Sequence, residues 1–342
     1  MKLVIQMACL NEAASLPATV AELPRKVEGF TAVEWLVVDD GSTDGTSDVA
    51  RSLGVDRVVT LPVNLGLARA FMIALETSIE RGADVIVHTD ADNQYCAADI
   101  AALVAPIVQG KSDIVIGQRP IATIATFSPL KKTLQRLGTW CVRQVSGTPV
   151  GDAPSGFRAF SRQAAIQLNV FGEYTYTLET IIQAGHKGIA VSNVPVRVNP
   201  PTRKSRLIKS LPSYLWRSAV TMLRVFIIYR PLRFFLALSA LTFLPGFLIC
   251  ARFLFYWMNG LGDGKVQSLI LGALLIAIAA ALCLVGLVAD LIAVNRRLLE
   301  RLQVMAYRAT PPSAVGTESP RETSPEPPSE ASPETPRERD ER

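Results

Sequence analysis

The first half of the chain alternates short apolar runs with polar turns and stretches of helical periodicity. Helical patterns begin near Glu12, Asp44, Leu67 and Ala97. The apolar runs cover residues 3–9, 33–38, 57–61, 83–89 and 113–117. This alternation of predicted strands and helices indicates an α/β domain with a mostly parallel sheet and helices on both faces.

Polar residues follow four of these apolar runs directly. They are Asn11-Glu12, Asp39-Asp40, Asn64 and Asp90-Ala91-Asp92. In open α/β sheets, ligands bind beyond the carboxyl ends of the strands, so we expect these side chains to converge on one ligand-binding rim.

Asp90 and Asp92 stand one residue apart after a run that reads as a buried strand. Two carboxylates in this arrangement can share one divalent cation whose other ligands are water and a diphosphate. An Asx turn that merely ends the strand is the alternative interpretation.

A second polar turn, at residues 37–46, combines two glycines with several hydroxyl and carboxylate side chains. Ser42 or Thr43 can cap the helix that follows, and Asp39 or Asp40 can accept a hydrogen bond from a nucleobase or a ribose. A well-capped strand-to-helix turn explains the same residues without a ligand. The chain has no phosphate-binding P-loop and no Gly-x-Gly-x-x-Gly at its first helix, which argues against ATP hydrolysis and nicotinamide chemistry.

The second half is dominated by two nearly continuous apolar stretches, residues 234–257 and 268–289, joined by a glycine-rich turn. Each is long enough to cross a hydrocarbon core of roughly 30 Å, so we predict a transmembrane hairpin. Positive charge precedes the first stretch and follows the second, which places both ends and the α/β domain on the cytoplasmic side of a cell inner membrane. The basic residues ahead of the hairpin are Arg203, Lys204, Arg206, Lys209, Arg217, Arg224, Arg230 and Arg233.

Composition supports this division of the chain. With 342 residues, 49% hydrophobic content and a mean hydropathy of +0.28, the chain is too apolar for one ordinary soluble domain. The net charge of +5 gathers just ahead of the hairpin, where anionic lipid explains it better than nucleic acid does. The five cysteines lack paired or metal-binding spacing, which fits a reducing cytosol.

These observations predict four parts. Residues 1–200 form the α/β domain, and residues 201–230 form a basic juxtamembrane segment in which 207–229 reads as an interfacial helix. Residues 231–297 hold the two transmembrane helices. Residues 298–342 form a cytoplasmic end with a disordered tail rich in Pro, Glu and Ser.

Six motifs occur in an order that resembles inverting family 2 glycosyltransferases of the GT-A fold, which is Rossmann-like. The resemblance is strongest to the polyprenyl-phosphate branch, typified by dolichyl-phosphate mannose synthases and undecaprenyl-phosphate glycosyltransferases, and it covers roughly residues 3–200 and the two spans. The motifs are Leu10-Asn11-Glu12, Asp39-Asp40-Gly41-Ser42-Thr43-Asp44-Gly45-Thr46, Asn64-Leu65-Gly66, Asp90-Ala91-Asp92-Asn93-Gln94, Gly117-Gln118-Arg119 and Gly151-Asp152-Ala153-Pro154-Ser155-Gly156-Phe157-Arg158.

The resemblance implies a role for each motif. The nucleotide sugar, UDP- or GDP-linked, would be held by Glu12, Asp39, Asp40 and Asp90. Mg²⁺ or Mn²⁺ on the donor diphosphate would be surrounded by Asp90, Asp92 and Gln94. Arg119 and Arg158 would lie near phosphate, where fixed guanidinium groups stabilise the leaving nucleoside diphosphate.

Asp152 is the best candidate for a general base if the acceptor is a hydroxyl. A polyprenyl phosphate is already anionic, and with that acceptor Asp152 would instead orient Arg158 or the sugar. Arg203, Lys204 and Arg206 are candidates for binding the acceptor phosphate, although attraction to lipid headgroups explains them equally well. The spacing of this segment departs from the family pattern, and Leu10 stands where the family usually has an aromatic residue.

The leading hypothesis is a membrane-anchored, metal-dependent inverting glycosyltransferase that moves one sugar from a nucleoside diphosphate to polyprenyl phosphate. A homo-oligomer is compatible with it. The alternatives are the same fold acting on a glycolipid, diacylglycerol or polysaccharide, and a non-catalytic membrane scaffold. A processive synthase is disfavoured, because residues 135–140 lack the arginine that precedes tryptophan in such enzymes.

Overall fold

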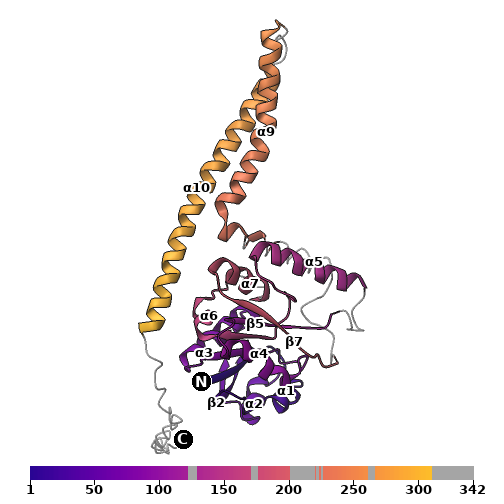
Figure 1. The fold of residues 1–342 in the computed structure, drawn as a ribbon, viewed down its shortest axis with the longest axis vertical. Coiled ribbons are helices and arrows are strands. Elements are labelled where there is room, and N and C mark those ends of the chain that lie inside the picture. The colour runs from indigo at the N-terminus through magenta and orange to yellow at the C-terminus, as the bar shows by residue number, and fades with distance from the viewer. Residues whose placement is uncertain are drawn as a thin grey trace, which may run out of the picture.

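The computed structural model describes residues 1–121, 129–170, 176–200, 220, 223–224, 226–260 and 266–309. An α/β domain carries a long helical hairpin that rises from one side of it (Figure 1). The predicted acceptor-phosphate residues Arg203, Lys204 and Arg206 lie outside the described residues, as do most of the predicted interfacial helix and the tail after residue 309.

The domain is built on one seven-stranded sheet with the strand order β3-β2-β1-β4-β6-β5-β7. All neighbouring strands are parallel except β6, which is antiparallel to both β4 and β5. The strands are β1 (Lys2–Cys9), β2 (Ala32–Asp39), β3 (Arg57–Thr60), β4 (Val85–His88), β5 (Ile114–Gln118), β6 (Arg158–Ser161) and β7 (Val191–Pro195).

Helices cover both faces of the sheet and bury two hydrophobic clusters. Strand β1 shows why, since alternate side chains of a strand point to opposite faces: Leu3 and Ile5 pack with α1, α2 and α4, whereas Val4 packs with α3, α6 and α7. The helices are α1 (Leu16–Glu22), α2 (Thr46–Ser52), α3 (Leu67–Glu80), the 3₁₀ turn η1 (Ala97–Asp99), α4 (Ile100–Val108), α5 (Pro129–Ser146), α6 (Arg162–Gln167) and α7 (Tyr176–Lys187).

The five predicted strands and the mostly parallel α/β sheet are confirmed. Strands β6 and β7 were not predicted from the pattern. Strand β6 has only four residues and begins with the charged Arg158, and β7 contains Asn193 and ends at Pro195, so neither shows a recognisable apolar run.

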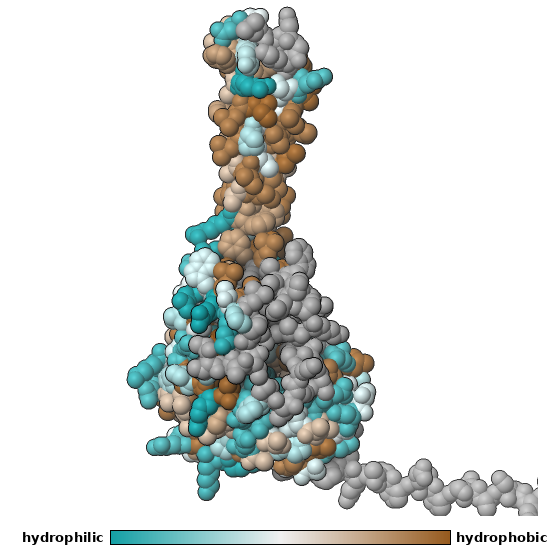
Figure 2. All heavy atoms as spheres, turned by 90° about the vertical axis from the view of Figure 1, so that its right-hand side faces the viewer, coloured by the Kyte–Doolittle hydropathy of each residue, from teal (hydrophilic) through white to brown (hydrophobic). Residues whose placement is uncertain are grey.

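The hairpin consists of α9 (Pro231–Met258) and α10 (Val266–Ala309). The most apolar 18-residue stretches of α9 and of residues Val266–Arg296 in α10 have mean hydropathies of 2.2 and 2.8, and both helices are long and apolar enough to cross a membrane. Figure 2 shows the resulting hydrophobic column above a more polar domain. Both predicted spans fall within these helices, and α10 continues beyond its apolar part.

Small residues let α9 and α10 approach closely, as is usual between membrane helices. A Cβ atom added to Gly246 would lie 2.9 Å from Leu275 Cβ and 3.0 Å from the carbonyl oxygen of Gly272. Nearer the domain, the Ser239 hydroxyl donates to the carbonyl oxygen of Ala279 at 2.8 Å. Glycine and a short polar residue therefore set the distance between the helices.

An aromatic stack joins the foot of the hairpin to the domain. The ring of Tyr229, just before α9, stacks on His186 of α7 with centroids 5.1 Å apart. The guanidinium carbon of Arg296, on α10, lies 4.2 Å from the centre of the same Tyr229 ring. The domain and α10 thus meet at one side chain, which lies just before α9 in the sequence.

We predict that Gly246→Ala weakens the hairpin, although alanine favours helix more than glycine does. Overpacking of this kind costs about 1–3 kcal/mol. Gly138→Ala is the matched control, because an added Cβ there has open space and should stabilise α5. Titration of the full chain with SDS, followed by circular dichroism, measures both changes; an equal or higher midpoint for Gly246→Ala would contradict the close contact.

Candidate active site at the carboxyl edge of the sheet

Parallel pairing brings three polar strand ends to one edge of the sheet. Cys9 at the end of β1 pairs with Asp39 at the end of β2, and Gln6 of β1 pairs with His88 at the end of β4. The residues that follow these strands share that edge. They are Asn11-Glu12, Asp40 and Asp90-Ala91-Asp92.

Hydrogen bonds join the turns after β1 and β2 into one wall. The Ser42 hydroxyl accepts from the Asn11 N–H at 2.8 Å, and the Asn11 side-chain oxygen accepts from the Thr43 N–H at 2.9 Å. The Glu12 N–H donates to the Thr46 hydroxyl at 2.9 Å. Asn11 has a φ of +54°, a conformation rare outside glycine and frequent where a site fixes the backbone.

Asp39 and Asp40 are buried and shape this wall through their own carboxylates. Asp39 accepts from the Ser42 N–H at 2.9 Å and from the Ser47 hydroxyl at 2.5 Å. Asp40 accepts from the N–H groups of Leu65 and Gly66, at 2.7 and 2.9 Å, and so fixes the turn after β3. Burial raises the pKa of Asp40, an effect that these two N–H groups oppose.

Gly41, which follows this pair, must be glycine. Its φ is +72°, and an added Cβ would lie 2.6 Å from the carbonyl carbon of Val63 and 2.7 Å from the nitrogen of Asn64. The turns after β2 and β3 therefore touch backbone to backbone. Nucleoside binding by Glu12, Asp39 and Asp40 remains a prediction. The two aspartates would accept hydrogen bonds from the nucleoside with the carboxylate lone pairs that are not used within the chain.

Asp90 and Asp92 lie on the same rim and are partly buried. The Gln94 N–H donates to Asp92 Oδ1 at 3.1 Å, so the Asx turn considered as an alternative is present and orients the carboxylate. Burial, followed by the negative charges of Asp92 and Glu12, raises the pKa of Asp90 to about 7. The carboxylates at this edge are crowded enough to repel one another.

A divalent cation would favour the ionised form of Asp90, whose pKa is raised mainly by burial and further by the charge of Asp92. In the described part of the chain, no group of three or more His, Cys, Asp or Glu side chains is placed to hold a metal ion by itself. Two carboxylates that need further oxygen ligands match a cation that arrives with a diphosphate. The role of the Gln94 side chain as a third oxygen ligand of the cation stays a prediction.

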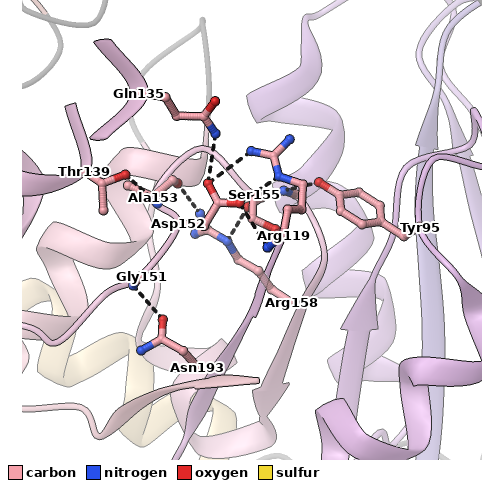
Figure 3. Close-up of polar contacts among 11 residues, drawn as sticks. Tyr95, Arg119, Gln135, Thr139, Gly151, Asp152, Ala153, Ser155, Arg158 and Asn193 are labelled. Atoms are coloured by element: carbon pink, nitrogen blue, oxygen red, sulfur yellow. Dashed lines mark hydrogen bonds and ion pairs between the residues drawn. The ribbon is translucent and has the colours of Figure 1, made fainter. Parts of the chain in front are cut away.

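Asp152 is fully buried and forms an ion pair with Arg119 (Figure 3). Arg119 Nε donates to Asp152 Oδ2 at 2.7 Å and Nη2 donates to Oδ1 at 3.1 Å. Gln135, on the inner face of α5, donates to the same Oδ1 at 3.1 Å. Asp152 therefore orients Arg119 rather than Arg158, the partner that the sequence suggested.

Arg158 is also fully buried, and its guanidinium is used by the chain itself. It donates to the carbonyl oxygens of Ser155, Ala153 and Thr177, at 2.9, 2.8 and 2.8 Å, and to the Thr180 hydroxyl at 2.6 Å. Burial lowers its pKa to about 10, so it remains charged at neutral pH. This geometry favours a supporting role for Arg158, which ties the motif at 151–158 to α7, over direct contact with phosphate.

Strand β6 delivers this motif to the acidic pair. Arg158 pairs with His88 of β4 in antiparallel register, so the preceding loop returns to the rim beside Asp90. A Cβ atom on Gly156 would lie 2.9 Å from both carboxylate oxygens of Asp90. Tyr95 and Tyr176 both hydrogen bond to the Gly156 backbone, and sequence analysis missed them, because neither belongs to a recognised motif.

The segment that follows β7 and leads toward the basic residues lies against the loop after Asp92. Tyr95 and Val198 form an antiparallel bridge, and the Asn199 N–H donates to the Gln94 carbonyl oxygen at 2.8 Å. The Asn199 side chain also donates to the carbonyl oxygen of Asn93 at 3.1 Å. The acidic loop and the chain before residue 200 are therefore neighbours.

Two other polar residues are buried in the domain. Glu179 of α7 is only 2% exposed, although it is charged. His88 contacts Gln6, and burial lowers its pKa to about 3, which keeps it neutral. A core role for His88 agrees with its place in the sheet.

Comparison with known proteins decides the family. The model of glycosyl transferase family 2 matches residues 4–168. An uncharacterized glycosyltransferase of Mycobacterium tuberculosis is 34% identical over 216 residues, which is 60% of this chain and 90% of that protein. The chain belongs to glycosyl transferase family 2.

Within this family, the chain is related to polyprenyl-phosphate sugar synthases. Polyprenol monophosphomannose synthase of Mycolicibacterium smegmatis is 27% identical over 197 residues, 54% of this chain and 73% of that protein. The fold is that of glucosyl-3-phosphoglycerate synthase of M. tuberculosis, solved with Mn²⁺, UDP-glucose and phosphoglyceric acid, with a TM-score of 0.51 and 20% identity over 66% of this chain and 78% of that one. The predicted GT-A fold is thereby confirmed.

We predict that Asp90→Asn stabilises the metal-free glycosyltransferase at pH 8 and leaves its stability unchanged near pH 4. Below pH 3.8 the carboxyl is protonated in both states; between 3.8 and about 7 only the unfolded chain ionises, so wild-type stability falls as pH rises and stays low above pH 7. Asparagine cannot ionise. Thermal unfolding in EDTA measures the change in Tm. A change of about 1 kcal/mol in the free energy of unfolding corresponds to about 2–4 °C. An equal gain at both pH values would contradict the raised pKa, and exposed Asp48→Asn serves as control.

We predict that Arg158→Met lowers stability by at least about 3 kcal/mol, because buried carbonyl oxygens lose their donors. The unfolding midpoint of Arg158→Met should fall by several degrees. Arg158→Lys keeps the charge but has fewer donors, so its midpoint should lie between those of the wild type and Arg158→Met. Differential scanning calorimetry of the full chain provides the measurement. An unchanged midpoint together with lost transferase activity would instead support contact of Arg158 with phosphate.

Proposed function

We propose that this glycosyltransferase is membrane-anchored and metal-dependent, and that it transfers one sugar, with inversion, from a nucleoside diphosphate to polyprenyl phosphate on the cytoplasmic face. One observation carries the proposal. The crowded Asp90–Asp92 rim lies beside the segment around Val198, which precedes the basic segment and the apolar hairpin in the sequence.

The donor side uses charge that the chain has already placed. Asp90 and Asp92 would hold Mg²⁺ or Mn²⁺, which supplies a positive charge to the donor diphosphate when bound. Glu12, Asp39 and Asp40 would hold the nucleoside. Arg119 is the cation best prepared for the leaving group, since its guanidinium is fixed by Asp152 and its side chain is 9% exposed.

The ion pair with Arg119 bears on the acceptor. A carboxylate that accepts two hydrogen bonds from a guanidinium and one from Gln135 is a poor base, because removal of a proton from the acceptor would disrupt these contacts. An anionic phosphate needs no base. Its oxygen would attack the anomeric carbon while the bond to the diphosphate breaks and the diphosphate leaves with the electron pair. This favours a lipid phosphate over a hydroxyl acceptor.

Chain connectivity supports the placement of the acceptor. Val198 bridges to Tyr95 near the acidic pair, and Arg203 follows only five residues later, so its Cα lies within about 18 Å of Val198 even in a fully extended chain. Chain length therefore allows Arg203 to reach a phosphate on the same rim, and we assign Lys204 and Arg206, which follow it in the sequence, to the same role. Their contact with an acceptor remains a proposal.

Helix α5 supports anchoring at the bilayer surface. It lies beside the foot of the hairpin in Figure 1 and extends away to one side, and its Leu137 and Trp140 side chains are 53% and 54% exposed. It contains four basic residues and no acidic residue. Exposed tryptophan and leucine among basic residues are typical of a helix at a lipid interface.

We predict that Asp92→Ala abolishes transfer from a nucleotide sugar to polyprenyl phosphate, by at least about 100-fold, because the donor diphosphate loses a metal ligand. Membranes that contain the full chain are incubated with labelled UDP- and GDP-sugars and the lipid, with Mg²⁺ or Mn²⁺. The surface variant Asp48→Ala should retain wild-type activity.

Three outcomes would contradict parts of the proposal. Unchanged turnover of Asp92→Ala would reject the metal site. Label in a glycolipid, diacylglycerol or polysaccharide, with none in an acid-labile lipid phosphate, would reject the acceptor. Metal-dependent nucleotide binding without transfer to any lipid would support a non-catalytic scaffold.

A further inference from the structure

Two buried tyrosine hydroxyls hold the backbone of one residue, Gly156, from both of its sides. The Gly156 N–H donates to Tyr95 Oη at 3.0 Å, and Tyr176 Oη donates to the Gly156 carbonyl oxygen at 3.2 Å. Tyr95 is 4% exposed and Tyr176 is 1% exposed. Because water cannot replace either contact, loss of one hydroxyl would leave a buried backbone group unpaired.

Both tyrosine rings are held in place by stacking. Tyr95 lies on Phe157 with ring centroids 5.0 Å apart and an interplanar angle of 20°. Tyr176 lies on Phe71 of α3 at 4.0 Å and 7°. Neither hydroxyl can swing away without breaking an aromatic contact in the core. The N–H and the carbonyl oxygen of Gly156 are therefore both fixed.

The fixed glycine lies against a carboxylate of the acidic pair. The position of a Cβ on Gly156 would be 2.9 Å from Asp90 Oδ1, 2.9 Å from Asp90 Oδ2 and 3.1 Å from Tyr176 Oη. Only glycine leaves room for this approach. The Asp90 carboxylate therefore packs against Gly156, whose N–H and carbonyl oxygen are held by the two tyrosines.

The two tyrosines reach this point from different parts of the fold. Tyr95 follows the acidic pair and bridges to Val198, in the segment before the basic residues. Tyr176 opens α7, which also accepts hydrogen bonds from Arg158 through Thr177 and Thr180. Side chains that orient a metal ligand from outside are worth about 10–100-fold in metal affinity.

We propose that Tyr95 and Tyr176 are positioning residues. They would fix the Asp90 carboxylate through the N–H and the carbonyl oxygen of Gly156, and so set the affinity of the rim for a divalent cation. This inference rests on the proposed function, which assigns Asp90 to the cation. Neither hydroxyl contacts the cation or the reacting atoms. Their effect passes entirely through the backbone between them.

The experiment measures Mn²⁺ binding to the full chain in detergent by the electron paramagnetic resonance signal of free Mn²⁺, with and without UDP or GDP. Tyr95→Phe and Tyr176→Phe should each raise the Kd for Mn²⁺ about tenfold. The double variant should lose less than the product of the two, because both act on one residue. Saturating Mn²⁺ should restore most of kcat, so the defect appears in the metal requirement.

Ser78→Ala is the matched control, since the Ser78 hydroxyl is fully buried and donates to Gln6 Oε1 at 2.9 Å within the core. It removes one buried hydroxyl and should leave the Kd for Mn²⁺ unchanged. Wild-type Kd in both phenylalanine variants, or an equal loss in Ser78→Ala, would overturn the inference alone. No Mn²⁺ binding by the wild type, with or without nucleotide, would overturn the metal assignment of the proposed function and the inference with it.

Discussion

One antiparallel strand determines how the site is assembled. In a fully parallel sheet, the residues just before a strand lie at the edge opposite the carboxyl ends. Strand β6 runs against β4 and β5, so the loop that precedes it lies at the rim where β4 ends. The pairing of Arg158 with His88 thus brings Gly156 to Asp90, and joins the ion pair of Asp152 and Arg119 to the edge that carries the acidic residues.

Charge at this edge is balanced in one part and unbalanced in another. Asp152 has Arg119, and Arg158 has four oxygens of the chain, so these buried charges are satisfied within the protein. Asp90 has Asp92 and Glu12 as neighbours of its own sign; their repulsion adds to the effect of burial, and the charges of Arg119 and Arg158 offset it only in part. In the proposed function, a cation that arrives with the ligand would complete the charge balance at this position.

The strand-helix rhythm, the polar rim and the apolar hairpin could be predicted from the sequence, because each depends on local periodicity or on the ends of strands. The supporting role of Arg158 could not, since its acceptors on Thr177 and Thr180 lie on a helix that meets it only through the antiparallel strand. A motif identifies a residue type at a position, whereas its hydrogen-bond partners depend on topology.

The same limit applies to Asp39 and Asp40. Their place at the end of β2 was predicted. Their hydrogen-bond donors were not, because the N–H groups lie 3 residues further along the chain for Asp39 and up to 26 residues further for Asp40. Tyr95 and Tyr176 left no signal, because a buried tyrosine that supports a site looks like any other core aromatic in sequence. The residues that shape the site were thus harder to predict than those that face it.

The stack of His186, Tyr229 and Arg296 would have a mechanical consequence if the hairpin anchors the domain at a bilayer, as proposed. A domain joined to its anchor by a flexible tether would sample many heights and tilts, whereas a Tyr229 ring packed between α7 and α10 would resist rotation of the domain. On the proposed placement, the sugar would be presented at a nearly constant depth. Acceptors would then be sorted by how far their phosphate stands out of the lipid, and the length of the buried tail would matter little.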